Sequence, residues 1–251
     1  MIYFVGAGSG APDLITVRGQ RLLQEADVII YAGSLVNPAL LEEKKQGCQV
    51  HNSAKMTLEE VFQVMEEAEQ AGKMTVRLHT GDPSIFGAVR EQMDLLEQAG
   101  IAYESCPGVS SMCGAAAALN LEYTLPDVSQ SVIITRMAGR TPVPEREEIA
   151  SFAAHQATMV IFLSAGMLEE LAARLLAGGY QESTPAALVY KATWPDEESY
   201  ACTVGSLAET GRLHGISKTA LVIVGDAVAH SHYRGSDLYH PEFETEFRSK
   251  K

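Results

Sequence analysis

Short apolar runs and amphipathic segments alternate along the whole chain. The apolar runs have the length and the β-branched or aromatic content of strands, and they lie at residues 2–5, 28–31, 49–51, 74–78, 101–105, 131–135, 158–163, 186–190, 200–203 and 220–224. Apolar residues recur at helical spacing between most of them, at 16–26, 57–71, 87–99, 111–119, 145–155, 167–177 and 206–214. This alternation is typical of an α/β fold with a largely parallel sheet.

The pattern divides the chain into two halves. The periodicity lapses at residues 120–127, where Pro126 lies in a polar stretch, and a new strand pattern follows. In the second half, the runs at 186–190 and 200–203 are close enough in sequence to form an antiparallel hairpin. We therefore expect two α/β domains, residues 1–120 with a mostly parallel sheet and residues 121–251 with a mixed sheet and a polar tail.

The run at residues 74–78 leads into a loop suited to a ligand. Its alternating apolar residues stop at the sequence TGDP, residues 80–83, and a helical pattern follows. Gly81 can adopt backbone conformations closed to other residues, and Pro83 fits the first turn of a helix. Backbone amides would then point into the space beyond the strand ends, where open α/β sheets bind ligands. An ordinary strand-to-helix turn uses the same residues and is the alternative.

Two further glycine-containing loops follow predicted strands, GAGSG at residues 6–10 and PGV at 107–109. The glycine spacing at 6–10 departs from GxGxxG, and residues 32–34, after the second strand, offer no carboxylate for a ribose diol. A nicotinamide cofactor is therefore disfavoured. Backbone groups and small side chains from three strand ends would instead line a site that suits a nucleoside.

Composition narrows the class of protein further. The 251 residues are 46% hydrophobic and carry a net charge of −13, which would repel nucleic acid over most of the surface. The longest apolar runs are strand-sized and far shorter than a membrane span. The four cysteines show neither a CxxC pair nor a framework spacing, which favours reduced thiols. We expect a cytoplasmic enzyme.

Five segments in order resemble the tetrapyrrole methylase family. They are VGAGSGAPDLITVRG at residues 5–19, ADVIIYAGSLV at 26–36, VRLHTGDPSIFGA at 76–88, CPGVSS at 106–111 and VYKATWPDE at 189–197. The resemblance covers essentially the whole chain. It implies two α/β domains with S-adenosylmethionine bound in the cleft between them, in a homodimer that methylates a small-molecule tetrapyrrole. Segments 135–145, 189–197 and 236–248 are similar to the branch that methylates C-11 of precorrin-4 or its cobalt form in cobalamin (vitamin B12) biosynthesis.

Position by position, the resemblance also implies a set of cofactor contacts. They are Thr80, Gly81, Asp82, Ile85, Ser110 and Ser111 in the first half, with Leu163, Ser164 and Ala192 in the second. The first loop departs from the family pattern GAGPGDP, because Ser9 and Ala11 replace its proline and aspartate. The shape of this loop therefore does not follow from the resemblance.

A tetrapyrrole carries several carboxylates, so its site needs cations despite the acidic surface. The candidates near strand ends or the resembling motifs are Arg136, Arg140, Lys191 and Lys55. For each one, a solvated surface charge is the alternative. We expect no metal site: His230, His232 and His240 lack a further ligand at suitable spacing. No residue pair demands the role of a general base, since methyl transfer from a sulfonium to an electron-rich carbon depends mainly on alignment.

Two other functions stay open at the level of sequence. One is another member of the family, which acts on a different precorrin carbon or on a diphthamide-type protein substrate. The other is a module that binds S-adenosylmethionine without transferring its methyl group.

Overall fold

The computed structural model describes residues 1–231 and 233–249, which form two compact units. The first contains Met1–Gly114 and the short segment Ala192–Asp196, and the second contains Ala115–Lys191 and Glu197–Lys251. The division therefore falls inside helix α4 (Ser111–Leu119), whereas the sequence pattern placed it after residue 120.

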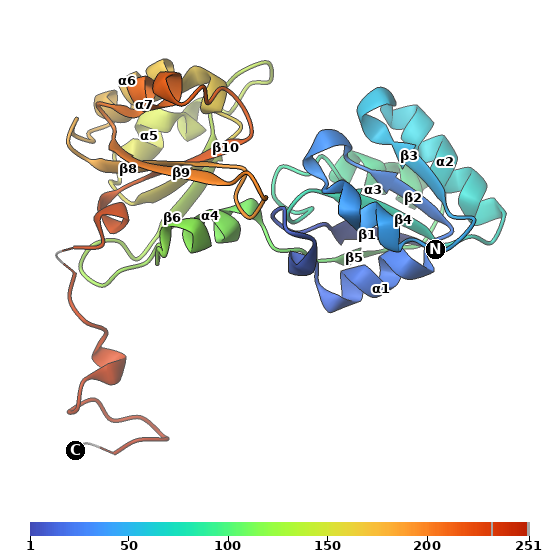
Figure 1. Cartoon of the computed structure of the whole chain (residues 1–251), viewed down its shortest axis with the longest axis horizontal. Coiled ribbons are helices and arrows are strands. Elements are labelled where there is room, and N and C mark those ends of the chain that lie inside the picture. Colours follow the sequence, from blue (N-terminus) through green and yellow to red (C-terminus); the bar gives the residue numbers. More distant parts are fainter. Residues whose placement is uncertain (232, 250–251) are drawn as a thin grey trace. The chain divides into compact units, whose positions relative to one another are not determined.

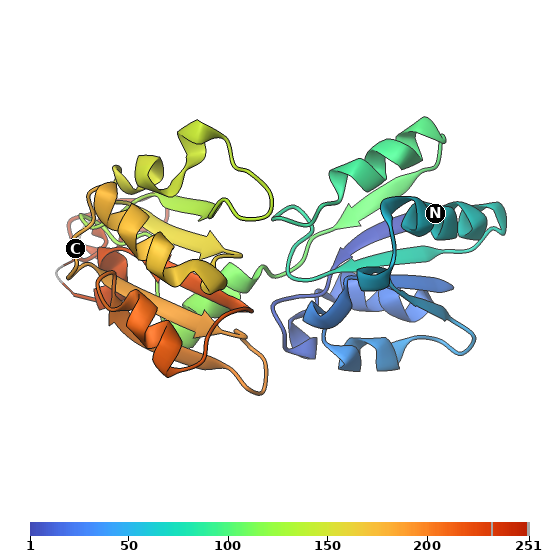
Figure 2. The ribbon, with the colours of Figure 1, turned by 90° about the horizontal axis from the view of Figure 1, so that it is seen from above.

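A five-stranded parallel sheet forms the centre of the first unit. Its strands stand in the order β3-β2-β4-β1-β5 and are β1 (Ile2–Gly6), β2 (Val28–Tyr31), β3 (Gln49–Asn52), β4 (Thr75–His79) and β5 (Tyr103–Cys106). Helix α1 (Val17–Glu25) packs on one face, while α2 (Leu58–Gln70) and α3 (Arg90–Gln98) cover the other (Figures 1 and 2). The predicted parallel sheet is thus confirmed. Thr57 and Glu60, whose spacing before an apolar run is the sequence signature of a capping box, form one at the start of α2.

Side-chain alternation along the central strands explains why both faces are covered. Val5, Val76 and Leu78 belong to the apolar cluster under α1, whereas Ile2 and Phe4 belong to the cluster under α2 and α3. Strands that are apolar on both sides are stable only when helices cover each face. The loops at the carboxyl ends of β1, β4 and β5 therefore follow strands that are packed on both faces.

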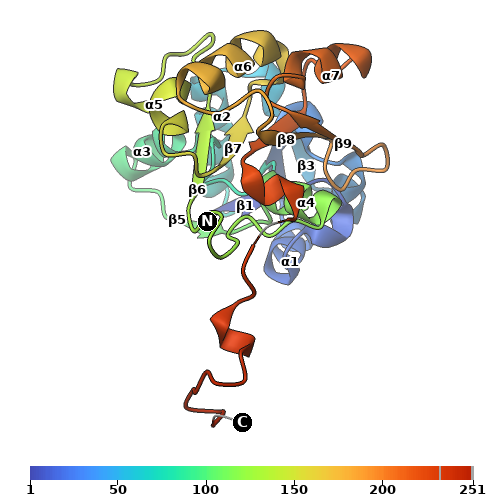
Figure 3. The ribbon, with the colours of Figure 1, turned by 90° about the vertical axis from the view of Figure 1, so that its left-hand side faces the viewer.

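The second unit contains a mixed sheet in the order β6-β7-β10-β8-β9. Its strands are β6 (Val132–Arg136), β7 (Thr158–Phe162), β8 (Pro185–Tyr190), β9 (Glu198–Thr203) and β10 (Ala220–Val224). Only the β6–β7 pairing is parallel, and β8 and β9 form the predicted antiparallel hairpin. Helices α5 (Ile149–Ala153), α6 (Leu168–Ala177) and α7 (Leu207–Leu213) lie over one face of this sheet (Figures 1 and 3).

Two helix predictions differ from the structure. The helix expected from residue 87 begins at Arg90, because Phe86 and Ala88 have positive φ angles of 53° and 49° that interrupt a helix. Pro83 accordingly begins a turn and does not open α3. The helix expected at 145–155 is split into a 3-10 turn, Glu145–Glu147, and α5, because Glu148 between them is extended.

No helix in the described part of the chain has the length and apolar character needed to span a membrane.

Candidate functional site

Three glycines bring the carboxyl ends of β1, β4 and β5 into backbone contact. A Cβ added to Gly108 would lie 2.2 Å from the carbonyl oxygen of Gly81 and 2.7 Å from the Cα of Gly6. A Cβ added to Gly6 would lie 2.5 Å from the Cα of Gly108 and from the same Gly81 oxygen. These separations are shorter than any real side chain tolerates, so the three loops can meet only as bare backbone.

Hydrogen bonds join the loops after β1 and β4. Gly8 donates to the carbonyl of Gly81 (3.3 Å), and the Gly81 amide donates back to the carbonyl of Gly8 (2.9 Å). The two residues have φ angles of +81° and +63°, which favour glycine. The predicted need for glycine at position 81 is thus explained by its backbone conformation.

The Asp82 carboxylate joins the loops after β4 and β5. Its Oδ2 accepts a hydrogen bond from the Gly108 amide (2.8 Å), and its Oδ1 accepts from the amide (2.8 Å) and hydroxyl (2.5 Å) of Ser84. Burial opposes the charged form, but these hydrogen bonds outweigh it and lower the pKa of Asp82 below its usual value of 3.8. The ionised Asp82 carboxylate therefore holds the loop after β4 to the loop after β5 by hydrogen bonds.

The start of α4 lies against Gly81. The Cα of Ser110 and the amide nitrogen of Ser111 would each be 3.5 Å from a Cβ on Gly81, which is ordinary van der Waals contact. Ile85 follows in the same turn, where its amide donates to the Asp82 carbonyl (3.2 Å). The structure thus gathers the following predicted cofactor residues in one region of the first unit: Thr80, Gly81, Asp82, Ile85, Ser110 and Ser111.

The segment Ala192–Asp196 packs against the first loop of the same unit. Thr193 Oγ1 lies 3.1 Å from Ser9 Oγ and accepts a hydrogen bond from the Ala11 amide (3.0 Å). A Cβ on Gly10 would lie 2.2 Å from the indole of Trp194 and 2.9 Å from the carbonyl oxygen of Ala192. The Ser9 hydroxyl, present where the family pattern has proline, therefore has a specific partner, whereas the Ala11 contact uses only the backbone amide. The sequence pattern did not indicate that Thr193 and Trp194 belong with this loop.

In the second unit, Leu163 and Ser164 follow β7. Leu163 has a φ of 54° and is 65% exposed, and such strained residues cluster at functional sites. Ser164 is fully buried; its hydroxyl donates to the carbonyl of Phe162 (2.7 Å) and accepts from the amide of Met137 (2.9 Å). Ser164 thus fixes the loop after β6 to the end of β7.

The four predicted substrate-binding cations differ in their contacts with the rest of the chain and in their exposure. Arg136 donates to the carbonyls of Met137 (3.1 Å), Thr141 (3.2 Å) and Pro142 (2.7 Å), so its guanidinium holds its own loop. Arg140, in that loop, is exposed, and Lys55 is exposed at the end of a 3-10 turn after β3. Lys191 has a φ of 45°, with its Nζ 5.3 Å from the centre of the Tyr190 ring.

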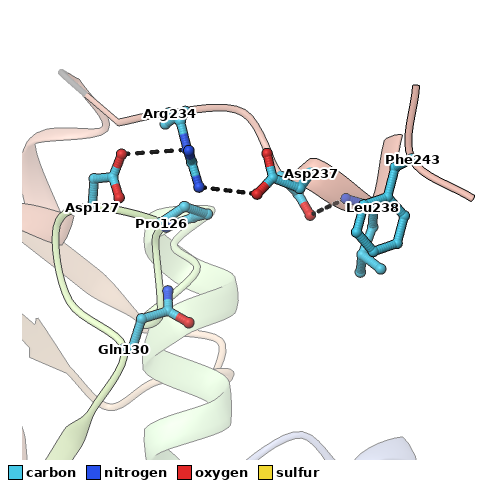
Figure 4. Close-up of a pocket in the computed structure, with 8 residues that line it drawn as sticks. Pro126, Asp127, Gln130, Arg234, Asp237, Leu238 and Phe243 are labelled. Carbon is cyan, nitrogen blue, oxygen red and sulfur yellow. Dashed lines mark hydrogen bonds and ion pairs between the residues drawn. The ribbon is translucent and has the colours of Figure 1, made fainter. Parts of the chain in front are cut away.

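A groove in the second unit contains none of the predicted site residues. Its volume is ≈ 360 Å³, and the residues that line it include Pro126, Gln130, Leu238 and Phe243 (Figure 4). Arg234 in this groove is paired with Asp127 at 3.3 Å and with Asp237 at 3.0 Å. Because carboxylates of the chain already neutralise it, this arginine is a poor candidate for a substrate carboxylate.

Within residues 1–231 and 233–249, no cluster of three or more histidine, cysteine, aspartate or glutamate side chains could hold a metal ion. His232 lies outside the described residues.

Comparison with known proteins gives consistent matches. A family sequence model described as Tetrapyrrole (Corrin/Porphyrin) Methylases matches residues 1–208. The chain is 52% identical to the cobalt-precorrin-4 C(11)-methyltransferase of Methanocaldococcus jannaschii, over 98% of this chain and 95% of that protein.

Solved structures agree with the sequence comparison. The crystal structure of a cobalamin biosynthetic enzyme, cobalt-precorrin-4 methyltransferase, is 47% identical with a TM-score of 0.89, and the match covers 90% of this chain and 95% of that one. Uroporphyrin-III C-methyltransferase from Thermus thermophilus, solved with S-adenosylhomocysteine, is 27% identical with a TM-score of 0.78, over 92% and 99% of the two chains. Because the family model matches residues 1–208 of this chain and the fold is shared with these enzymes, the chain belongs to the tetrapyrrole methylase family.

Proposed function

We propose that this chain transfers the methyl group of S-adenosylmethionine to C-11 of precorrin-4 or its cobalt form in cobalamin biosynthesis. The main support is the identity with cobalt-precorrin-4 C(11)-methyltransferase over nearly the whole of both chains. We further infer a homodimer, as the family resemblance implies, and a cytoplasmic location, as composition and the strand-sized apolar runs indicate. Light scattering on the purified chain would test the dimer.

The backbone of the first unit fits a nucleoside cofactor. Glycines 6, 81 and 108 remove side chains where three strand ends meet, and Gly81 lies beside the backbone of Ser110 and Ser111. Residues 80–82, 85, 110, 111 and 192 would hold the cofactor from this unit. Leu163 and Ser164 are further candidate contacts that the family resemblance implies. S-adenosylmethionine would supply a methyl group already activated by its sulfonium.

What the protein must add is alignment of the two reactants. Asp82 and the paired glycines fix the loops before a ligand arrives, so little ordering of the protein is needed on binding. Displacement at a sulfonium methyl needs no acid–base pair, so we assign that role to no residue. Positioning is therefore the catalytic device that we infer.

Turnover tests the proposal directly. The purified protein, cobalt-precorrin-4 and S-adenosylmethionine should yield S-adenosylhomocysteine together with a product methylated at C-11, located by NMR with a ¹³C-labelled methyl group. A methyl group on another ring carbon would identify a different branch of the family. Binding of S-adenosylhomocysteine without any turnover would indicate a non-catalytic module.

Cation replacements test where the tetrapyrrole binds. We expect Lys55→Ala, Arg140→Ala and Lys191→Ala each to weaken tetrapyrrole binding about tenfold, because a charge-assisted contact contributes about 1.5–3 kcal/mol. Binding of S-adenosylhomocysteine, titrated in parallel, should be unchanged. Arg136→Ala should act differently, since loss of its three carbonyl contacts loosens residues 137–142 and also lowers stability. Parent-like tetrapyrrole affinity in all four variants would contradict this placement of the substrate.

A further inference from the structure

The predicted cofactor contact Ala192 lies between two residues with a strained backbone. Lys191 and Thr193 have φ angles of 45° and 67°, a left-handed conformation that a β-branched residue such as threonine rarely adopts. Such residues persist only where the surrounding structure holds them, and they cluster at ligand sites. The strain therefore draws attention to the segment Ala192–Asp196, which connects β8 to β9 but belongs to the first unit.

The hydroxyl of Thr193 holds this segment to the loop after β1. Its Oγ1 accepts a hydrogen bond from the Ala11 amide at 3.0 Å and lies 3.1 Å from the hydroxyl oxygen of Ser9. Because the amide can only donate, the proton of the Thr193 hydroxyl is available for Ser9. Ser9 is only 4% exposed, so little water can compete for this pair.

The methyl group of Thr193 contacts a second part of the site. A Cβ added to Gly114, in the first turn of α4, would lie 3.0 Å from Thr193 Cγ2 and 3.0 Å from the Cβ of Ser9. The same helix begins at Ser111, beside Gly81. Threonine thus combines a hydroxyl for the first loop with a methyl group for α4, whereas serine lacks the methyl group and valine lacks the hydroxyl.

The residues on either side of Thr193 pack on Gly10. A Cβ added to Gly10 would lie 2.9 Å from the carbonyl oxygen of Ala192 and 2.2 Å from the indole of Trp194. The loop that contains Gly10 is in turn hydrogen-bonded to the loop after β4. The contacts of Thr193 and its neighbours therefore join Ala192 to the loops that carry the other predicted cofactor residues of this unit.

We propose that Thr193 is a positioning residue for S-adenosylmethionine, which holds the backbone of Ala192 in its binding geometry before the cofactor arrives. A segment that is already ordered loses little further freedom when a ligand binds, so the affinity is higher. This assignment rests on the proposed methyl-transfer function. It adds to that function a residue that acts through Ala192 and does not itself touch the cofactor.

Thr193→Val and Thr193→Ser test the two parts of the side chain separately. Thr193→Val keeps the branched shape and the methyl contact with α4 but removes both hydroxyl contacts. We expect it to weaken the binding of S-adenosylhomocysteine about tenfold, measured by calorimetric titration, because residues 192–196 are no longer held to the first loop. Thr193→Ser keeps the hydroxyl and should recover most of this affinity.

Thr57→Val is the matched control. The Thr57 hydroxyl also accepts a hydrogen bond from a backbone amide, that of Glu60 (3.3 Å), but Thr57 caps α2 and belongs to none of the loops after β1, β4 and β5. Both valine variants should unfold at a lower denaturant concentration than the parent, since each leaves an amide without its acceptor. Only Thr193→Val should also lose affinity for S-adenosylhomocysteine.

The fluorescence of Trp194, the single tryptophan of the chain, reports on this segment without any ligand. In Thr193→Val the indole should be quenched more strongly by acrylamide than in the parent, because its packing on Gly10 is loosened. In Thr193→Ser and Thr57→Val the quenching should match that of the parent.

Two results would overturn the assignment. If Thr193→Val bound S-adenosylhomocysteine as tightly as Thr57→Val does, the role of the hydroxyl would be purely structural. If Thr193→Ser bound it as weakly as Thr193→Val, the hydroxyl contacts would not be what holds Ala192. These titrations need no product, so they decide the role of Thr193 separately from the turnover assay that tests methyl transfer.

Discussion

Alanine at position 108 is expected to eliminate binding of the cofactor product and to destabilise the first unit by about 3 kcal/mol. The new Cβ would be 2.2 Å from the Gly81 carbonyl oxygen and 2.7 Å from the Gly6 Cα, and both are backbone atoms that no rotamer change can move. The loops after β1, β4 and β5 must then separate. Calorimetric titration with S-adenosylhomocysteine and denaturant unfolding of the same protein would measure the two effects.

Gly100→Ala is the matched control for this variant. Gly100 has a φ of +68° but has no atom within 4 Å of its added Cβ, so alanine there tests backbone strain alone. We expect it to cost about 1 kcal/mol and to leave S-adenosylhomocysteine affinity unchanged. If Gly108→Ala bound the nucleoside as tightly as Gly100→Ala does, the close glycine contact would have no role in the site.

Local patterns predicted the elements whose stability depends on local interactions. The capping box at Thr57 and Glu60 satisfies the first amides of α2 with residues three apart, so its sequence signature suffices. The β8–β9 hairpin likewise follows from two apolar runs close in sequence. The parallel order of the first sheet follows from strands that alternate with helices and are apolar on both faces.

The parts that the sequence did not predict depend on partners far apart in the chain. Thr193 pairs with Ser9 across 184 positions, and no periodicity encodes that contact. The turn from Pro83 to Phe86 resembles a helix start in sequence, but the positive φ at Phe86 and Ala88 delays α3 to Arg90. There the side-chain amide of Gln92 donates to the Ala88 carbonyl at 2.8 Å, while its oxygen accepts from buried Arg77. The Arg77–Gln92 hydrogen bond thus links the start of α3 to β4, a tertiary contact that the local pattern does not contain.

The residues of the candidate site show the same difference between local and long-range determinants. Gly81 could be selected from its place after a strand, because only the local backbone conformation matters there. The role of Arg136 could not, since an arginine at a strand end looks the same whether it binds a substrate carboxylate or the carbonyls of its own loop. The geometry of the loop determines which of these groups the arginine binds, and the sequence pattern does not contain that geometry.

Asp82→Ala should lower the free energy of unfolding by about 2–3 kcal/mol at pH 7, because the amides of Gly108 and Ser84 lose a charged acceptor. Without the hydrogen bond from the Gly108 amide to Asp82, the loops after β4 and β5 are no longer held together. We therefore expect the S-adenosylhomocysteine affinity to fall at least about tenfold. The control is Asp94→Ala in the same unit. Its surface ion pair with Arg90 is more than half exposed, so its loss should cost less than about 1 kcal/mol.

The pH dependence of this difference gives the sharper test. The folded pKa of Asp82 lies below its usual value of 3.8, so the carboxylate contributes its stability above that pH. The contribution declines as the pH falls through the lowered folded value, where the carboxylate takes up a proton. Denaturant unfolding between pH 7 and pH 3 should therefore show a constant gap between parent and Asp82→Ala down to about pH 5, which then narrows in acid. A gap that stays constant to pH 3, or one no larger than that of Asp94→Ala, would show that a neutral side chain could join these two loops equally well.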